Sequence, residues 1–480
     1  MATISSAGIG SGLDVNSIVS QLVALERKPI EQLTTQTGKL NTQLSAFGKL
    51  QTAFATLRDS ARTLSGAEAW NPTLGSSSDA SAVSVTTGAG TTPANYSVQV
   101  SALAFSQTLV AGTAYASGTS TVGAGTLTLE LGAWDAGQTT FTPKSGATAV
   151  SVSIAATDTL EAVRDKINGA GAGVTASIVN DASGARLVMR STDSGTANAF
   201  RVSVADNGDT GSNGTTLSAL AFDPSAGVTG GMTQRQAAAD AVATINGIDV
   251  RSSSNTLADV IDGATLTLGK VTTAPVDVAI KRDGETIQKS VSAFVTAYNA
   301  LVSLVREQTK YDAGTKTGGP LQGDRSAINL GNQLRVLIGG TSTASSTYQR
   351  LPDVGLDIQT DGTLKLNTAK LNTAIGKITD LKALFTTTDD VDATREGFGV
   401  RLRKLADQLL GAEGALTTRQ EGLRSQISRN GTRETELEDR VAQVEKRLKA
   451  QYSALDTRMA SLNQLSSYVT AQVAKWNASS

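Results

Sequence analysis

Side chains that could carry out chemistry are scarce in this sequence, and two of the usual types are missing. The 480-residue chain contains no His and no Cys. It therefore has no imidazole base and no thiolate nucleophile or zinc ligand, which excludes a Ser-His-Asp triad and any disulfide. Paired carboxylates or a Ser-Lys pair are still chemically allowed, but no pattern in the sequence brings such a pair together. The sequence predicts a protein that is not an enzyme and that holds no metal and no cofactor.

A few other segments contain candidate binding residues. The stretch from Asp206 to Gly214 is rich in oxygen ligands, as a calcium loop would be, but it lacks the spacing and the closing Glu of an EF-hand. A solvated turn is the favoured interpretation, and Asp389-Asp390-Val391-Asp392 is interpreted as an exposed acidic loop. The aromatic residues Tyr115, Trp134 and Phe141 are candidates for a binding face, with burial in a small core as the favoured alternative.

The charge balance argues against two classes of partner. Lys plus Arg number 42 and Asp plus Glu 43, so the formal net charge is −1 and no long-range field draws the protein to nucleic acid or to an anionic membrane. No apolar run approaches the roughly 20 residues that span a bilayer. The start, MATISSAGIGSGLD, lacks the basic and apolar segments of a cleaved signal peptide. By this test alone the chain would be cytosolic, although export without a signal peptide would escape it.

The first element that the sequence predicts is a long N-terminal helix. Asp14 is a suitable N-cap, and Ile18, Leu22 and Leu25 follow at helical spacing. Pro29 lacks the N–H that an interior turn needs, so it should kink or interrupt the helix and is a candidate hinge. Beyond it, apolar residues recur every seven positions, as in a coiled coil. The two series are Leu33, Leu40, Phe47, Phe54, Ala61 and Leu50, Leu57, Leu64.

The C-terminal segment repeats this heptad pattern. Its main series is Ile427, Glu434, Val441, Leu448, Leu455, Leu462, Val469 and Trp476, with Leu437, Val444 and Leu465 as companions. Glu436 with Arg440, and Glu445 with Lys449, are i,i+4 pairs in the favourable orientation. Such a helix needs a partner along its apolar seam, and the N-terminal helix is the obvious one, with neighbouring subunits covering the remainder.

The sequence therefore predicts a coiled-coil or inter-subunit interface along these two helices. It is assigned to Ile18, Leu22, Leu25, Leu33, Leu40, Phe47, Val441, Val444, Leu448, Leu455, Leu462, Leu465 and Val469. Polar residues interrupt the seams and should lower affinity while fixing register. These residues are Gln36, Gln43, Asn430, Glu434 and Gln451.

Between Asn71 and about Pro275 the chain is rich in Gly, Ser, Thr and Asn and contains short runs in which apolar and polar residues alternate. These runs predict antiparallel strands. The clearest runs begin at Tyr96, Leu127, Val150 and Phe200, and one helix is expected over Thr159–Asn168. Helical patterns return from Asp283 to about Gly340, over Leu371–Phe385 and over Phe398–Leu410. A hairpin is expected over Leu356–Leu366, with Asp361-Gly362 at its turn.

The predicted fold class is α+β, with long terminal coiled-coil helices forming a rod, a helical-bundle domain with a β-hairpin, and an inserted pair of β-rich domains. Residues 1–40 and 441–480 are expected to form a coiled-coil leg domain, and residues 41–74 and 276–440 a helical rod or bundle. Residues 75–110 and 236–275 should form one β-rich domain, and residues 111–235 an outer β-rich insertion. A chain that leaves a rod and returns to it suits the subunit of a fibre.

Several segments resemble one known family. The run Gly8–Ile30, with Gly-Ser-Gly-Leu-Asp joined to Ala-Leu-Glu-Arg-Lys-Pro, closely resembles the start of the flagellar hook-associated protein 2 (filament cap) family, and Gln451–Val469 resembles its end. Residues 160–178, carrying Ile167-Asn168, look like the hook IN motif of flagellar axial proteins. Ile245–Leu268 also looks like the cap family, whereas Ala111–Asp158 matches nothing recognisable.

The resemblance implies a secreted protein of the bacterial flagellum that is exported without a cleaved signal and forms a homo-oligomeric ring at the distal tip of the filament. It implies flagellin, the hook–filament junction protein, and an export chaperone with the export apparatus as partners. Terminal helices would form legs against the filament, and the β-rich domains a plate beneath which flagellin folds and inserts. Tip domains of this kind can also act as adhesins on host surface glycans or mucin. The alternatives are a surface adhesin and another flagellar axial protein, such as a junction protein.

Overall fold

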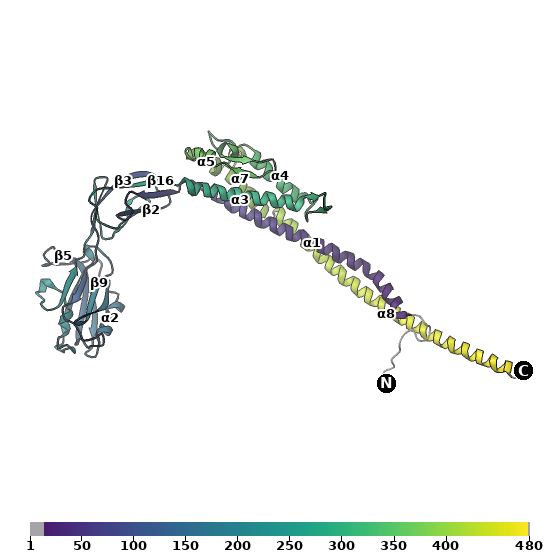
Figure 1. The fold of residues 1–480 in the computed structure, drawn as a ribbon, viewed down its shortest axis with the longest axis horizontal. Helices are drawn as coiled ribbons and strands as arrows, with labels where there is room; N and C mark the ends of the chain where they lie inside the picture. The colour runs from purple at the N-terminus through teal and green to yellow at the C-terminus, as the bar shows by residue number, and fades with distance from the viewer. Residues whose placement is uncertain (1–13, 479–480) are drawn as a thin grey trace. The chain divides into compact units, whose positions relative to one another are not determined.

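The computed structural model describes residues 14–478, which divide into two compact units. One contains the terminal segments, up to Trp70 and from Glu285 onward, and is almost entirely helical. The other, residues 71–284, is built from antiparallel strands and one α-helix. The fold is therefore mixed α+β, as the sequence predicts (Figure 1).

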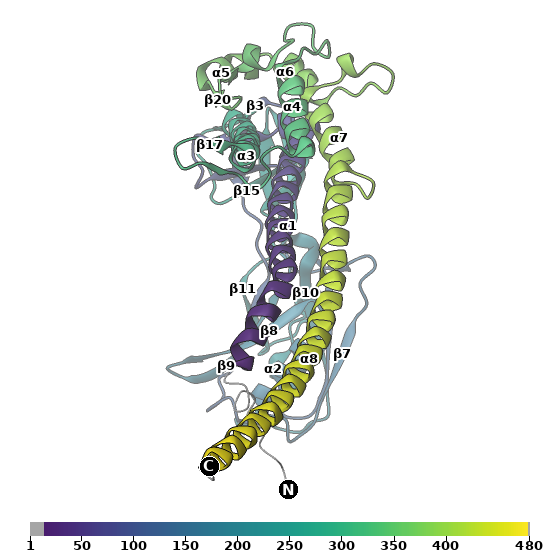
Figure 2. The ribbon, with the colours of Figure 1, turned by 90° about the vertical axis from the view of Figure 1, so that its right-hand side faces the viewer.

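The helical unit is organised around its two long terminal helices, α1 and α8, which lie side by side (Figures 1 and 2). The carboxylate of Asp14 accepts a hydrogen bond from the Ser17 N–H at 3.0 Å, so the predicted N-cap of α1 is confirmed. The α-helices of this unit are α1 (Val15–Ser65), α3 (Gly284–Thr309), α4 (Arg325–Gly339), α5 (Thr368–Ile375), α6 (Ile378–Thr386), α7 (Phe398–Leu410) and α8 (Ala415–Ala478). Its short strand pairs are β17 (Tyr311–Asp312) with β18 (Thr317–Gly318) and β19 (Leu356–Ile358) with β20 (Leu364–Leu366).

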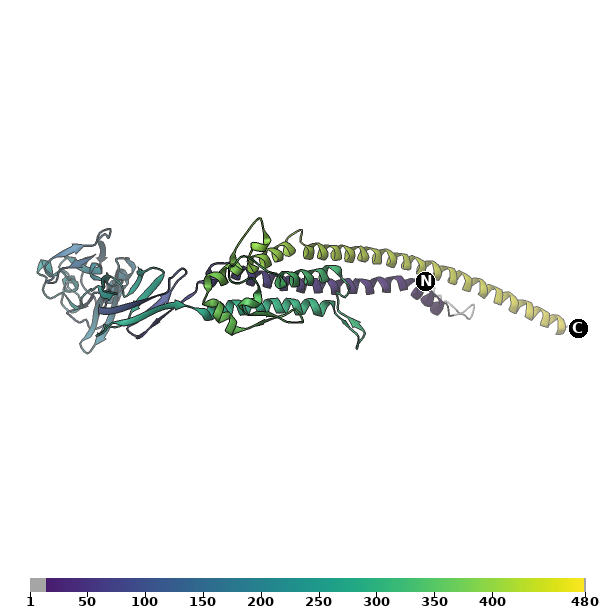
Figure 3. The same cartoon turned by 90° about the horizontal axis from the view of Figure 1, so that it is seen from above.

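One apolar core holds the inner part of this unit together. It joins the second half of α1 to α3, α4, α6, α7 and the start of α8. Trp70 is fully buried there, stacks on Phe385 at 5.0 Å between ring centroids, and donates its indole N–H to the Leu64 carbonyl at 2.8 Å. An aromatic ring of this size excludes much apolar surface from water, and its one polar atom is satisfied. Figure 3 shows α3 running beside α1 in this part of the unit.

The β-rich unit contains two sheets in its inner part. Their strands are β1 (Thr73–Ser77), β2 (Val83–Thr87), β3 (Ala94–Ala102), β12 (Ala241–Ile245), β13 (Ile248–Ser252), β14 (Thr256–Ile261), β15 (Ala264–Leu268) and β16 (Val276–Arg282). The sheets have the orders β1-β16-β3-β12-β13 and β14-β15-β2, and enclose a core of Val, Ile, Leu and Ala. Residues 276–282, which the predicted division assigned to the helical domain, form β16 of this unit and pair with β3.

The outer part of the β-rich unit has its own two sheets and core. Its elements are β4 (Thr108–Ala111), β5 (Gly125–Trp134), β6 (Phe141–Pro143), β7 (Val150–Ile154), α2 (Leu160–Gly169), β8 (Val174–Asp181), β9 (Gly184–Ser191), β10 (Ala199–Asp206) and β11 (Met232–Gln236). One sheet has the order β10-β5-β6 with β7 also paired to β5, and the other has the order β11-β4-β9-β8. Helix α2 buries Leu160, Val163 and Ile167 in the shared core.

Most predicted elements are confirmed, and two details differ. All four predicted strand runs lie in strands, and the helix over Thr159–Asn168 is α2 with Thr159 as its N-cap. The helix predicted over Leu371–Phe385 is two helices, α5 and α6, because the chain turns at Gly376-Lys377. Helix α1 runs through Pro29 without interruption, so this proline does not end the helix.

Asparagine side chains join neighbouring segments by the same pair of hydrogen bonds in both units. Asn168 of α2 donates to the Ala176 carbonyl and accepts from its N–H, at 2.9 and 2.7 Å. Asn255 does this with Ala104, at 2.9 and 2.7 Å, and Asn299 with Leu364, at 2.8 and 2.7 Å. Each amide replaces one rung of backbone pairing, so Asn168 of the IN motif is a structural residue.

Candidate assembly interface

The inner stretch of the α1–α8 pair is part of the bundle core. Leu40 and Phe47, both predicted interface residues, are buried there, together with Phe54 of the same heptad series and Leu57 of the second series. Leu416 and Leu423 of α8 lie in the same core, and Ile427 packs against it. Heptad residues in this stretch therefore stabilise the fold of one chain.

Further toward the N-terminus of α1 the two helices share a smaller, separate cluster. Val15, Val19 and Val23 are buried against Val441, with Ile30, Leu448 and Tyr452 packed around them. Of the predicted residues, Val441 is therefore buried, and Leu33, Val444 and Leu448 are half-buried. This cluster is small, so its contribution to stability is modest.

At the start of α1, the face that packs on α8 of the same chain is not the predicted stripe, whose place in an interface between subunits stays a prediction. Ile18 is half-buried, but Leu22 and Leu25 are 36% and 56% exposed, and the face that meets α8 carries the valines instead. Both stripes have helical spacing, and the stripe with the larger leucines is the one that α8 of the same chain leaves exposed. Val15, Val19 and Val23 recur at i, i+4 and i+8, so their spacing was the signal that could have identified the buried face.

The last part of α8 exposes its apolar residues. Every residue from Ser461 to Asn477 is exposed, and the predicted residues Leu455, Leu462, Leu465 and Val469 have exposed fractions between 43% and 59%. Tyr468 and Val473 are exposed as well. An apolar stripe along three or more turns of a helix is typical of a surface that another chain covers.

Polar contacts join the two helices between these stretches. The Thr34 hydroxyl donates to the Glu434 carboxylate at 2.7 Å, and the Asn430 amide donates to the Thr37 hydroxyl at 3.2 Å. The predicted seam residues Asn430 and Glu434 thus lie at the helix–helix contact. Gln43 is half-buried, whereas Gln36 and Gln451 are exposed and make no such link in the part of the chain that the structure describes.

One of the two predicted ion pairs on α8 is confirmed. Lys449 lies 2.6 Å from Glu445, and its hydrogen bond lowers the pKa of that carboxyl group. Glu436 pairs with Arg433 at 2.9 Å rather than with Arg440. Both pairs are exposed, so each contributes little to stability. Pro29 lies within α1 and is exposed, and its role as a hinge stays a prediction.

The other candidate residues have structural roles in the described chain. The Asp206 carboxylate accepts hydrogen bonds from the N–H groups of Gly208 and Ser218, and a hydrogen bond from the Thr216 side chain leads the effects that lower its pKa to about 2. The segment from Asp206 to Gly214 is therefore a turn, as the favoured interpretation of the sequence predicts. Between residues 14 and 478, no group of three or more acidic side chains is arranged to hold a metal ion.

Two of the three aromatic candidates, Tyr115 and Trp134, belong to the outer core or pack against it. Tyr115 is 1% exposed, and Trp134 packs against Phe141 and Phe222 with ring centroids 4.8 and 5.8 Å apart. The alternative of burial in a small core is confirmed for Tyr115, and Trp134 packs against that core, whereas Phe141 is half-buried and contacts Trp134. None of the helices in the described part of the chain is long and apolar enough to cross a membrane.

Comparison with known proteins identifies a family along most of the chain. The models for the N-terminus and C-terminus of flagellar hook-associated protein 2 match residues 11–107 and 238–464, and the flagellin hook IN motif matches residues 137–193. The start of the Gly8–Ile30 motif lies outside the described residues, as does the end of the chain beyond residue 478.

Two relatives from different organisms match over nearly their whole length. The flagellar hook-associated protein 2 of Escherichia coli (strain K12) is 31% identical over 98% of each chain. The A-type protein of Pseudomonas aeruginosa is 32% identical over 96% of this chain and 95% of its own. The crystal structure of the D1-D2-D3 domains of the flagellar cap protein FliD from Escherichia coli covers 79% of this chain and 99% of its own, with a TM-score of 0.63 and 30% identity.

Proposed function

The chain belongs to the flagellar hook-associated protein 2 family, and on that premise we propose that it caps the distal tip of a bacterial flagellar filament. The observation that carries this proposal is the match to cap-family proteins along 98% of both chains. The work of a cap is to hold exported flagellin subunits at the tip while they fold and insert. This needs shaped surfaces and no bond chemistry, which agrees with a chain without His or Cys.

In this proposal the copies assemble into a homo-oligomeric ring, and the terminal helices are legs that form coiled-coil contacts. The exposed stripe formed by Leu455, Leu462, Leu465 and Val469 supports it, because a lone helix gains nothing from displaying such residues to water. Leu22 and Leu25, which α8 leaves uncovered, would meet a neighbouring subunit or the filament.

We extend the proposal to the domains and partners expected from the sequence. Residues 1–40 and 441–480 would form the legs and residues 41–70 and 285–440 the bundle, because residues 71–74 and 276–284 belong to the β-rich unit. The two β-rich domains would form the plate over the channel. Flagellin, the hook–filament junction protein and the export chaperone and apparatus would be the partners. Secretion would use the flagellar route without a cleaved signal, and Pro29 would be the hinge between leg and bundle.

The test is deletion of the gene, with and without purified protein added back. We expect the deletion strain to lose filaments and motility and to release monomeric flagellin into the medium, and we expect added protein to restore filament growth. Normal filaments combined with lost surface binding would replace the cap function with that of an adhesin for host glycans or mucin. A deletion strain with normal filaments and normal adhesion would remove both functions.

A further inference from the structure

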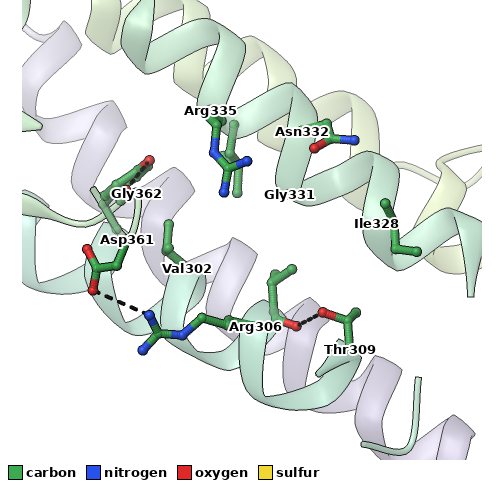
Figure 4. Close-up of a pocket in the computed structure, with 12 residues that line it drawn as sticks. Val302, Arg306, Thr309, Ile328, Gly331, Asn332, Arg335, Asp361 and Gly362 are labelled. Carbon is green, nitrogen blue, oxygen red and sulfur yellow. Dashed lines mark hydrogen bonds and ion pairs between the residues drawn. The ribbon is translucent and has the colours of Figure 1, made fainter. Parts of the chain in front are cut away.

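A hollow in the helical unit has features that the proposed cap function does not by itself use. Its volume is about 190 Å³, and it lies between α3, α4 and the turn of the β19–β20 hairpin. Val302, Val305, Ile328 and Leu334 make its walls largely apolar, and the carbonyl of Gly362 is held by the Tyr298 hydroxyl at 3.1 Å. Figure 4 shows these elements around the open space.

Two arginines stand at the edge of this hollow, and they differ in one respect. Arg306 forms an ion pair with Asp361 at 3.4 Å. Arg335 points into the space from α4 and, within residues 14–478, makes no ion pair or hydrogen bond (Figure 4). An apolar hollow with one uncommitted guanidinium is suited to an apolar side chain that has a carboxylate next to it in sequence.

The same chain displays such a pair of residues at the tip of the loop between α6 and α7. Val391 is 97% exposed, which is the largest exposure among the apolar side chains described as exposed, and the Asp390 side chain is 96% exposed. Lys404 approaches Asp390 only to 3.7 Å, so this carboxylate is available to a second cation.

The loop is built to hold this tip outward. The Asp389 carboxylate accepts hydrogen bonds from the N–H groups of Val391 and Asp392, both at 2.9 Å. Asp392 in turn accepts from the N–H and hydroxyl of Thr394, at 2.9 and 2.6 Å, and Arg395 lies 3.6 Å from it. A turn fixed in advance loses little conformational entropy when it binds.

We propose that the Asp390-Val391 tip of one subunit occupies the Arg335 hollow of a second copy of this chain. Val391 then fills the apolar space between α3 and α4, and the Asp390 carboxylate pairs with the Arg335 guanidinium. No residue of the loop lines the hollow in its own chain, so the contact joins two copies. Knob and hollow lie at different places on one unit, and repetition of such a head-to-tail contact generates a ring when the rotation closes. The inference rests on the proposed homo-oligomeric cap and identifies one of its subunit contacts.

The absence of cysteine from the chain makes a direct test available. Three full-length variants, V391C, I328C and V336C, each carry a single thiol. Ile328 lines the hollow and is 43% exposed, whereas Val336 lies on the same helix, is 76% exposed and does not line it. We expect mild oxidation to cross-link a mixture of V391C and I328C at least about tenfold faster than a mixture of V391C and V336C, because the contact raises the effective thiol concentration.

Charge reversal provides a second, independent readout. R335E and D390R should each weaken association of the full-length protein by about tenfold or more, as measured by sedimentation, and the double variant should recover most of the loss. Equal cross-linking of both mixtures, or no recovery in the double variant, would overturn the contact. If the wild-type protein still restores filaments in the deletion strain, the cap function survives that outcome. If cross-linking succeeds while restoration fails, the contact stands and the cap function falls.

Discussion

The two long helices carry one heptad pattern, yet its inner and outer stretches have different surroundings. In the inner stretch Phe47, Phe54 and Leu57 of α1 are fully buried beneath α7 and the start of α8. In the outer stretch only a small valine cluster joins the helices, and Leu462 and Val469 are more than half exposed. Spacing of seven residues therefore specifies where apolar residues line up along a helix, while the neighbouring elements decide whether one chain or several bury them.

Truncation of one large residue in each stretch should give the greatest contrast. F54A removes a fully buried ring and should lower the free energy of unfolding by about 3–5 kcal/mol. L462A removes an exposed side chain and should change it by less than about 0.5 kcal/mol while impairing filament restoration. Denaturant titration followed by the fluorescence of the buried Trp70 measures the first effect. Similar losses of stability in both variants would erase the distinction between the stretches.

A smaller change in stability should come from the polar residues that lie between the inner and outer stretches of the helix pair. N430L replaces a half-buried amide at the helix–helix contact and should stabilise the pair by about 1 kcal/mol, since an apolar side chain suits a seam position better. If legs must release and rebind as a filament grows, the same variant should slow growth. The matched control is Q36L, because Gln36 is exposed and its replacement should leave stability unchanged. Faster growth with N430L would contradict the idea that weak seams serve stepping.

The smallest effect concerns the ion pair of Glu445 and Lys449. The folded-state pKa of Glu445 is lowered chiefly by the hydrogen bond from Lys449, so the pair stabilises the helix above the ordinary carboxyl pKa and is lost as pH falls through the lowered value. Acidification below about pH 4 should therefore increase proteolysis of the outer α8 slightly in the wild type. The E445Q variant should lack that added sensitivity, and an identical pH response in both would exclude the pair as its cause.

Much of this fold follows from local patterns in the sequence, because those patterns act at short range. Asp14 caps α1 as expected, the helix expected over Thr159–Asn168 is α2, and the alternating runs at Leu127 and Phe200 are strands. The break between α5 and α6 also lies at a local signal, Gly376. A single glycine does not reveal whether the chain turns there or continues as one helix, so the break was not predicted.

What the sequence did not reveal depends on partners far away in the chain. Leu22 and Val23 are adjacent and equally apolar, and only the position of Val441 decides which of them is buried. The asparagine hydrogen bonds also depend on a partner that is distant in the sequence, since Asn255 bonds to Ala104 in the inner part of the β-rich unit. The complementarity of Asp390-Val391 with the Arg335 hollow is likewise a property of surfaces, which no spacing of residues expresses.

The β-rich unit leaves and re-enters the helical chain through two strands that are paired with each other, since Thr73 of β1 lies opposite Arg282 of β16. The outer part repeats this arrangement, with Thr108 of β4 opposite Gln236 of β11. In each part, the strand by which the chain enters and the strand by which it leaves are one strand spacing apart, about 5 Å, which a tight turn can bridge. Each part is thus a cassette nested in the one before it. A gene could lose, lengthen or exchange either cassette while the remaining chain stays continuous, so the β-rich domains can vary in size and sequence without redesign of the helices.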